Sequence, residues 1–178
     1  MTRKLVLKEF SFTNGDPKFT PRTPYVGMTD DELLSIEKFP YILNERCPFK
    51  AVFQVGKNQE VELTGVVPKG FTYNCADIPF LCQPLSYDKH SPFVKNASFI
   101  HDYLCSRKRA LYNEWGLKLQ GITGAEFRNM TSIIFCHALM QNAVPYKKAH
   151  LMSFCVNTFQ SLIYEWYTLD RTETGLWR

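Results

Sequence analysis

A hairpin pattern near the middle of the chain constrains the fold most. Two apolar runs, Phe49–Val55 and Glu60–Val67, flank Gly56-Lys57-Asn58-Gln59, which has the composition of a tight turn. A shorter run at residues 39–43 precedes this hairpin. Because turns this short join antiparallel strands, the pattern predicts a small antiparallel sheet in the N-terminal half.

The C-terminal half changes to helical spacing. Apolar residues recur every three or four positions over 93–106, 123–141 and 145–167. Thr123 and Glu126 have the spacing of a capping box, which marks the start of a helix. The chain is therefore predicted to be α+β, with about three C-terminal helices packed on the small sheet.

The length of 178 residues predicts a single domain over 1–178. We expect four parts: an irregular N-terminal arm at 1–38, strands and a polar turn at 39–92, a helical part at 93–168, and a tail at 169–178. Within the arm, residues 4–12 could form an edge strand, and prolines and glycines indicate a long loop at 13–29. Thr29 and Glu32 form a second capping-box pattern, which predicts one or two helical turns.

Composition excludes several classes of protein. Hydrophobic residues make up 45% and charged residues 21%, as in a globular protein with a core. The net charge of +4 falls far below the basic stripe of a dedicated nucleic-acid binder, so no specific nucleic-acid partner is expected. No apolar run reaches the roughly 20 residues of a membrane span, and the charged N-terminus does not resemble a signal peptide. We expect a protein made in the cytoplasm, with no membrane partner and no cofactor.

The segment at 66–79, followed by a helix that carries His101 and Asp102, is the most informative for function. It places Asn74 and Asp77 in a turn, where their side chains can bond nearby backbone amides and serve structure alone. Alternatively, Asn74, Asp77, His101 and Asp102 meet in a small catalytic or metal pocket. The sequence leaves both interpretations open.

These motifs resemble the domain of unknown function 1353, a family encoded mainly by bacteriophages and prophages. Its hallmark is Gly-Phe-x-x-(Asp/Asn)-x-x-(Ser/Asp)-Ile-Pro, followed by a helix with His-Asp-Tyr. The similarity spans about residues 60–160, and the later motifs match at Ile134-Phe135, Ala143-Val144-Pro145 and Lys148-Ala149-His150-Leu151-Met152. The resemblance implies a phage protein and brings little established chemistry.

The chain departs from the family pattern at three polar positions. Many members have Asp where this chain has Asn74, Ser where it has Asp77, and Asp where it has Ser132. If the acidic residues of the family hold a metal, this chain has lost two carboxylates and gained one. The altered polar set favours a role other than catalysis.

Sulfur chemistry offers two further alternatives. His101 and Cys105 are four residues apart and share a helix face, which makes them candidate metal ligands, and Cys75 and His137 would have to complete a zinc site. No recognised zinc spacing is present, so no metal is expected. A cysteine nucleophile working with His101 is not favoured either, since no feature marks an activated thiol. All six cysteines are expected to be reduced.

The tail ends in Trp177 and Arg178, residue types that are common in interface hot spots, so they are candidate anchors in another subunit. Our leading expectation is a phage-encoded, non-enzymatic virion component, such as a tail, neck or capsid accessory. It would be made in the host cytoplasm and assemble with other virion proteins or with itself. The alternative is a small phage hydrolase, metal-dependent or of Cys/His type, that acts on peptidoglycan or another host polymer.

Overall fold

Two small antiparallel sheets and five helices make up the computed structural model, which describes residues 3–74, 91–163, 166 and 169. The first sheet has the order β1-β4-β5 and consists of β1 (Leu5–Phe12), β4 (Cys47–Val55) and β5 (Gln59–Val67). The second has the order β2-β3-β6 and consists of β2 (Phe19–Pro21), β3 (Tyr41–Leu43) and β6 (Thr72–Tyr73). The predicted α+β class is confirmed.

The predicted hairpin forms two of the three strands of the first sheet, with β4 in the centre and β5 at one edge. β4 pairs with β5 from Cys47–Val67 to Val55–Gln59, and Gly56 takes a positive φ of 64° in the turn between them. β1 pairs with the other side of β4 and is interrupted by a register shift between Leu7 and Glu9. The edge strand expected at residues 4–12 is therefore present.

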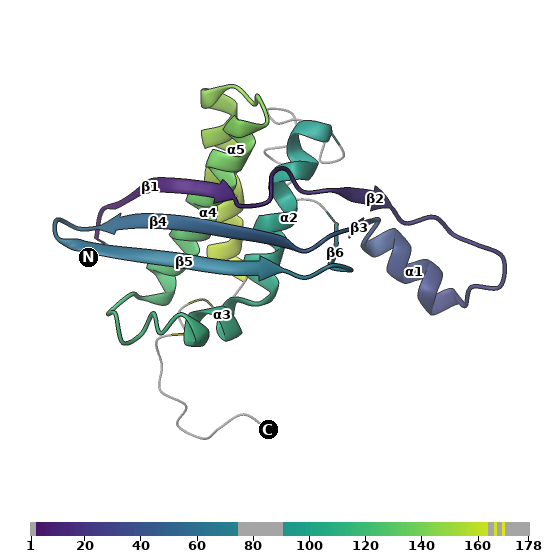
Figure 1. The fold of residues 1–178 in the computed structure, drawn as a ribbon, viewed down its shortest axis with the longest axis horizontal. Coiled ribbons are helices and arrows are strands. Elements are labelled where there is room, and N and C mark those ends of the chain that lie inside the picture. Colours follow the sequence, from purple (N-terminus) through teal and green to yellow (C-terminus); the bar gives the residue numbers. More distant parts are fainter. Residues whose placement is uncertain (1–2, 75–90, 164–165, 167–168, 170–178) are drawn as a thin grey trace, which may run out of the picture.

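Helices cover one face of this sheet (Figure 1). The described residues form five helices: α1 (Asp30–Lys38), α2 (Pro92–Ser106), α3 (Lys108–Glu114), α4 (Gly124–Gln141) and α5 (Tyr146–Ile163). Of these, α2, α4 and α5 lie over the sheet. α4 packs against α2, α5 and β1 and so occupies the middle of the helical layer. Its buried face includes Phe127, Met130 and Phe135, which belong to the continuous apolar core.

The N-terminal arm is more regular than predicted. The loop expected at 13–29 contains β2, which pairs with β3, and the expected helical turns extend to the nine residues of α1. α1 begins with the predicted capping box, in which Thr29 and Glu32 bond each other's backbone amides. Figure 1 shows α1 and the loop before it projecting from one end of the molecule. α3 was not predicted at all, because a seven-residue helix offers too few turns for a clear period.

Candidate functional site

The site is built on α2, whose apolar face enters the core. The helix begins at Pro92, which suits a first helical position because its missing N–H would have no helical partner there. Val94, Ala97 and Leu104 are fully buried along the inner face. His101 lies on the same face and is 2% exposed, so its imidazole needs partners within the protein.

The nearest partner of His101 is the sulfur of Cys105, one helical turn further on. Cys105 Sγ lies 3.4 Å from His101 Nε2 and 3.9 Å from Nδ1, within the reach of a hydrogen bond to sulfur. The ring of Phe135 in α4 lies at a centroid distance of 5.2 Å and closes the inner side of the imidazole. Thiol and imidazole are therefore held as a contacting pair.

Asp102 contributes a negative charge on the other side of the ring. Its Oδ1 lies 3.7 Å from His101 Nδ1, the distance of an ion pair and longer than a hydrogen bond. Burial opposes the charge on the imidazole, but the Cys105 sulfur and the Asp102 carboxylate outweigh it and raise the pKa of His101 to about 10. The site favours an imidazolium at neutral pH.

A cavity of about 590 Å³ opens beside this cluster. Asn74, His101, Asp102 and Cys105 line it together. The remaining walls come from the end of α1, from β6 and the residue before it, from the start of α3 and from α5. They include two cations and four aromatic rings: Lys38, Lys108, Phe39, Phe71, Tyr73 and Phe159. The cavity can therefore hold a ligand that combines apolar surface with negative charge.

The structure thus brings together three of the four residues predicted as a pocket, Asn74, His101 and Asp102. Asp77 lies outside the described residues, as do Cys75, Trp177 and Arg178. His137 lies in α4 and is not among the residues that line the cavity. Cys105, which the sequence analysis placed on the same helix face as His101 as a candidate metal ligand, is the contact partner of His101. Their spacing of four residues predicted that the two side chains share a face, and the structure adds the direct contact.

The cysteines differ in chemical state. Cys47, Cys105 and Cys136 do not form disulfides, whereas Cys155 is disulfide-bonded. The expectation that every cysteine is reduced is therefore wrong, because the apolar helical setting of Cys155 indicates burial and does not reveal whether its sulfur is bonded. Burial raises the pKa of both Cys47 and Cys136 to about 11, with a further contribution from Asp16 at Cys47. Among these three free cysteines, only Cys105 is partly exposed.

Two searches of the described residues found nothing further. No group of three or more His, Cys, Asp or Glu side chains is arranged to hold a metal ion within residues 3–74 and 91–163. Over the same ranges, no helix combines the length and hydropathy that crossing a membrane requires.

Comparison with known proteins identifies one family. A family model described as "Protein of unknown function (DUF1353)" matches residues 50–156, which include β5, the cavity residues of α2, and most of α5. No curated protein matches the chain, and no solved structure matches it. The predicted resemblance is confirmed.

Proposed function

Because the chain belongs to DUF1353, a family whose description names no activity, we propose from the cavity itself that the protein is a thiol-dependent hydrolase. Cys105 is the nucleophile and His101 is the acid and base. The observation that carries the proposal is the 3.4 Å contact between Sγ and Nε2 at the wall of a cavity. A nucleophile within reach of a base that a third group orients is the usual arrangement of covalent hydrolases.

The reaction begins with the Cys105 thiolate and the His101 imidazolium. The thiolate attacks the carbonyl carbon of an amide, and the leaving amine takes a proton from His101 as the thioester forms. Water then attacks the thioester and gives a proton to His101, which releases the carboxylic acid and restores the thiolate. Asp102 positions the imidazole and favours its charged form, and we assign the developing oxyanion to Asn74, which lines the same cavity.

The cavity walls support a polymer that carries carboxylates, such as peptidoglycan. Lys38 and Lys108 offer positive charge to the acidic groups of its peptides, while Phe71 and Phe159 offer apolar surface. The disulfide at Cys155 supports action outside the reducing cytoplasm, because such bonds persist in oxidising surroundings. This substrate class agrees with a phage protein that meets the host envelope.

The test is the release of new amino groups from purified peptidoglycan by the full chain. Cys105→Ala should lower the rate by about 10³-fold or more, because no other group in the cavity replaces the thiolate. Cys105→Ser keeps the size of the side chain and should lose nearly as much. Asn113→Ala, at an exposed position of α3 that does not line the cavity, is the control and should keep full activity. Full activity in Cys105→Ala would overturn the proposal.

The exposed arm favours a second candidate, a non-enzymatic virion component that works by assembly. Tyr25, Val26 and Leu34 lie in the projecting segment and are 64%, 102% and 62% exposed. Apolar side chains gathered on a projection are typical of protein contacts. In this proposal the arm binds another virion protein, or a second copy of the chain, after synthesis in the host cytoplasm.

Mass spectrometry of purified virions tests this second candidate. It requires the protein at a fixed number of copies per particle, and Val26→Asp should reduce its incorporation because a charge at the contact must be desolvated. Glu37→Asp, a conservative change at an exposed position of α1, is the control. Absence of the protein from virions would exclude the virion role and leave the hydrolase proposal untouched.

A further inference from the structure

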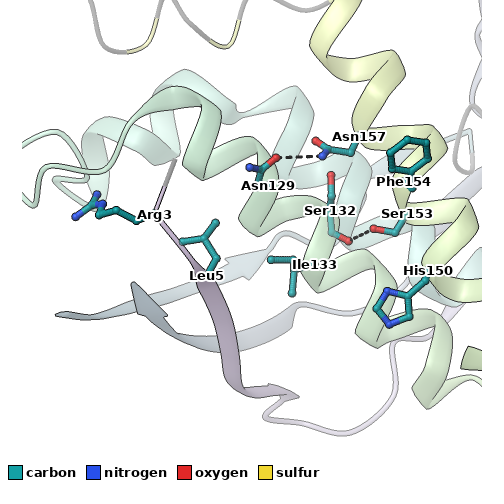
Figure 2. A pocket seen from close by; sticks show the side chains of 9 residues that line it. All are labelled: Arg3, Leu5, Asn129, Ser132, Ile133, His150, Ser153, Phe154 and Asn157. Carbon is teal, nitrogen blue, oxygen red and sulfur yellow. Dashed lines mark hydrogen bonds between the residues drawn. The ribbon is translucent and has the colours of Figure 1, made fainter. Parts of the chain in front are cut away.

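A second cavity, of about 400 Å³, lies between α4, α5 and the start of β1 (Figure 2). It shares no lining residue with the cavity beside Cys105. Its polar lining consists largely of hydroxyl and amide side chains, contributed by Asn129 and Ser132 of α4 and by Ser153 and Asn157 of α5. The two cavities are thus chemically different.

Ser132 is the residue that singles this cavity out. Its side chain is 3% exposed, and its hydroxyl has no hydrogen-bond partner in the part of the chain that the structure describes. Helical hydroxyls usually bond a carbonyl of the preceding turn, as Ser98 does with Val94 at 2.8 Å and Thr131 with Arg128 at 2.8 Å. In Figure 2 the Ser132 hydroxyl points instead toward the Asn129–Asn157 pair. A buried hydroxyl held away from its own helix is poised for an external partner.

The neighbouring groups are fixed by bonds among themselves. Ser153 Oγ donates to the backbone carbonyl of Ser132 at 2.7 Å, and Asn157 Nδ2 donates to Asn129 Oδ1 at 3.0 Å. Arg128 Nε donates to Asn157 Oδ1 at 3.0 Å, which orients this amide further. Among the described residues, the Asn129 amide nitrogen keeps its donors for a ligand.

The arginine that lines the cavity is already paired. Arg3 is paired with Glu126 at 2.8 Å, and the lining contains no acidic residue. The cavity therefore offers no carboxylate to a cation, and its one other ionisable side chain, His150, has its ring against Tyr146 at a centroid distance of 4.1 Å. A neutral ligand rich in hydroxyl groups fits this lining best.

Phe154 supplies the apolar part of the site. It is 66% exposed, and Figure 2 shows its ring beside Asn157 at the cavity. An exposed aromatic face covers the apolar C–H face of a sugar ring, while amides and hydroxyls bond the sugar's edge. We propose that this cavity binds one pyranose unit of an uncharged glycan, with Phe154 as the stacking platform and Ser132 and Asn129 as hydrogen-bonding partners.

Titration of the full chain with two uncharged probes, the trimer of N-acetylglucosamine and maltotriose, tests the proposal. At least one should bind saturably and shift the amide resonances of α4 and α5. Phe154→Ala should weaken binding about tenfold or more by removing the platform. Leu162→Ala, which removes an 80% exposed side chain on the same helix outside the cavity, is the matched control and should bind normally.

Ser132→Ala separates a ligand site from a purely structural role. Removing an unpartnered buried hydroxyl should leave the melting temperature unchanged or raise it, because no internal bond is lost. Binding of the sugar should nevertheless fall about tenfold, the loss expected for one buried hydrogen bond. The proposal is overturned if neither sugar binds, if binding survives either substitution, or if inorganic phosphate occupies the cavity more tightly. These measurements do not depend on the hydrolase activity.

Discussion

Arg3 and Glu126 join two elements that are far apart in the sequence. Arg3 Nη2 lies 2.8 Å and Nε 2.9 Å from the two carboxylate oxygens of Glu126. The same carboxylate accepts from the backbone N–H of Thr123 at 2.9 Å, completing the capping box of α4. One side chain therefore fixes both the start of the helix and the approach to β1.

Removing this carboxylate should make the protein less stable at neutral pH. Hydrogen bonding from Arg3 outweighs burial and lowers the pKa of Glu126 to about 2, below its ordinary 4.5. The stabilisation is therefore present above pH 4.5 and is lost as the pH falls toward 2. Glu126→Gln should lower the free energy of unfolding at pH 7 by on the order of 2 kcal/mol, because solvent screens the partly exposed Arg3.

Urea unfolding at pH 7 and pH 3 measures this effect. In Glu126→Gln the free energies of unfolding at pH 7 and pH 3 should differ by less than in the wild type, because the variant no longer titrates at this position. Glu62→Gln removes an exposed carboxylate that lies 3.6 Å from Lys50 and should change stability by less than about 1 kcal/mol. If both variants lost the same free energy of unfolding, the contact of Glu126 with Arg3 would contribute no more than an exposed ion pair.

Gly65 on β5 allows the ring of Phe49 on β4 to lie close against the backbone of β5. A Cβ atom at this position would lie 3.0 Å and 3.1 Å from two ring carbons of Phe49, its partner across β4 and β5. Phe49 is 2% exposed and touches Trp115, so it has little room to move. Gly65→Ala should therefore lower the free energy of unfolding by about 1–3 kcal/mol through overpacking.

Thermal or urea unfolding of Gly65→Ala and Thr64→Ala gives a matched comparison within β5. The Thr64 side chain is exposed, and the bond to Trp115 uses only its backbone carbonyl, so its replacement should cost less than about 1 kcal/mol. Stability of Gly65→Ala equal to that of the wild type would mean that Phe49 can shift without cost.

Local patterns predicted the elements that local interactions determine. The capping boxes at Thr29 and Thr123 depend on residues three positions apart, and both are present. The hairpin likewise follows from two runs and the turn between them. β2 could not be predicted in this way, because three residues among prolines become a strand only by pairing with β3.

In the candidate site, too, the sequence predicts the local contacts and not those that depend on tertiary packing. The contact of His101 with Cys105 follows from a spacing of four residues on one helix. The walls of the cavity come from Lys38, Tyr73 and Phe159, which lie in three distant segments. No spacing in the sequence relates these residues to one another, so only the packed structure reveals that they meet.

Alkylation should distinguish the three free cysteines. Burial raises the pKa of Cys47 and Cys136 to about 11, so both remain protonated and shielded near neutral pH. Cys105 is partly exposed, and its sulfur contacts the imidazole of His101 at 3.4 Å. Brief treatment of the native protein with iodoacetamide, followed by peptide mapping, should modify Cys105 first. Modification of Cys47 or Cys136 as fast as that of Cys105 would contradict this order. In urea, where the protein is unfolded, all three cysteines should react at similar rates.

His101 should remain protonated well above the usual range of histidine. Its pKa of about 10 depends on the Cys105 sulfur, the largest of the contributions that raise it, so Cys105→Ser should lower this pKa. NMR titration of ring-labelled histidines measures the pKa of His101 in the wild type and in Cys105→Ser. Because the folded pKa exceeds the ordinary 6.5, the stabilisation is fully present below pH 6.5 and is lost as the pH rises through 10. The free energy of unfolding should fall across this range, and less steeply in Cys105→Ser.

His137 provides an internal control in the same spectra. Burial, together with the nearby His150, lowers the pKa of His137, so its resonances should titrate below 6.5 while those of His101 remain in the protonated position. Cys105→Ser should leave the His137 titration unchanged, because His137 lies on α4 outside the cavity. If His101 titrated together with His137, the imidazole would be neutral at pH 7. The thiolate–imidazolium pair on which the hydrolase proposal rests would then not exist.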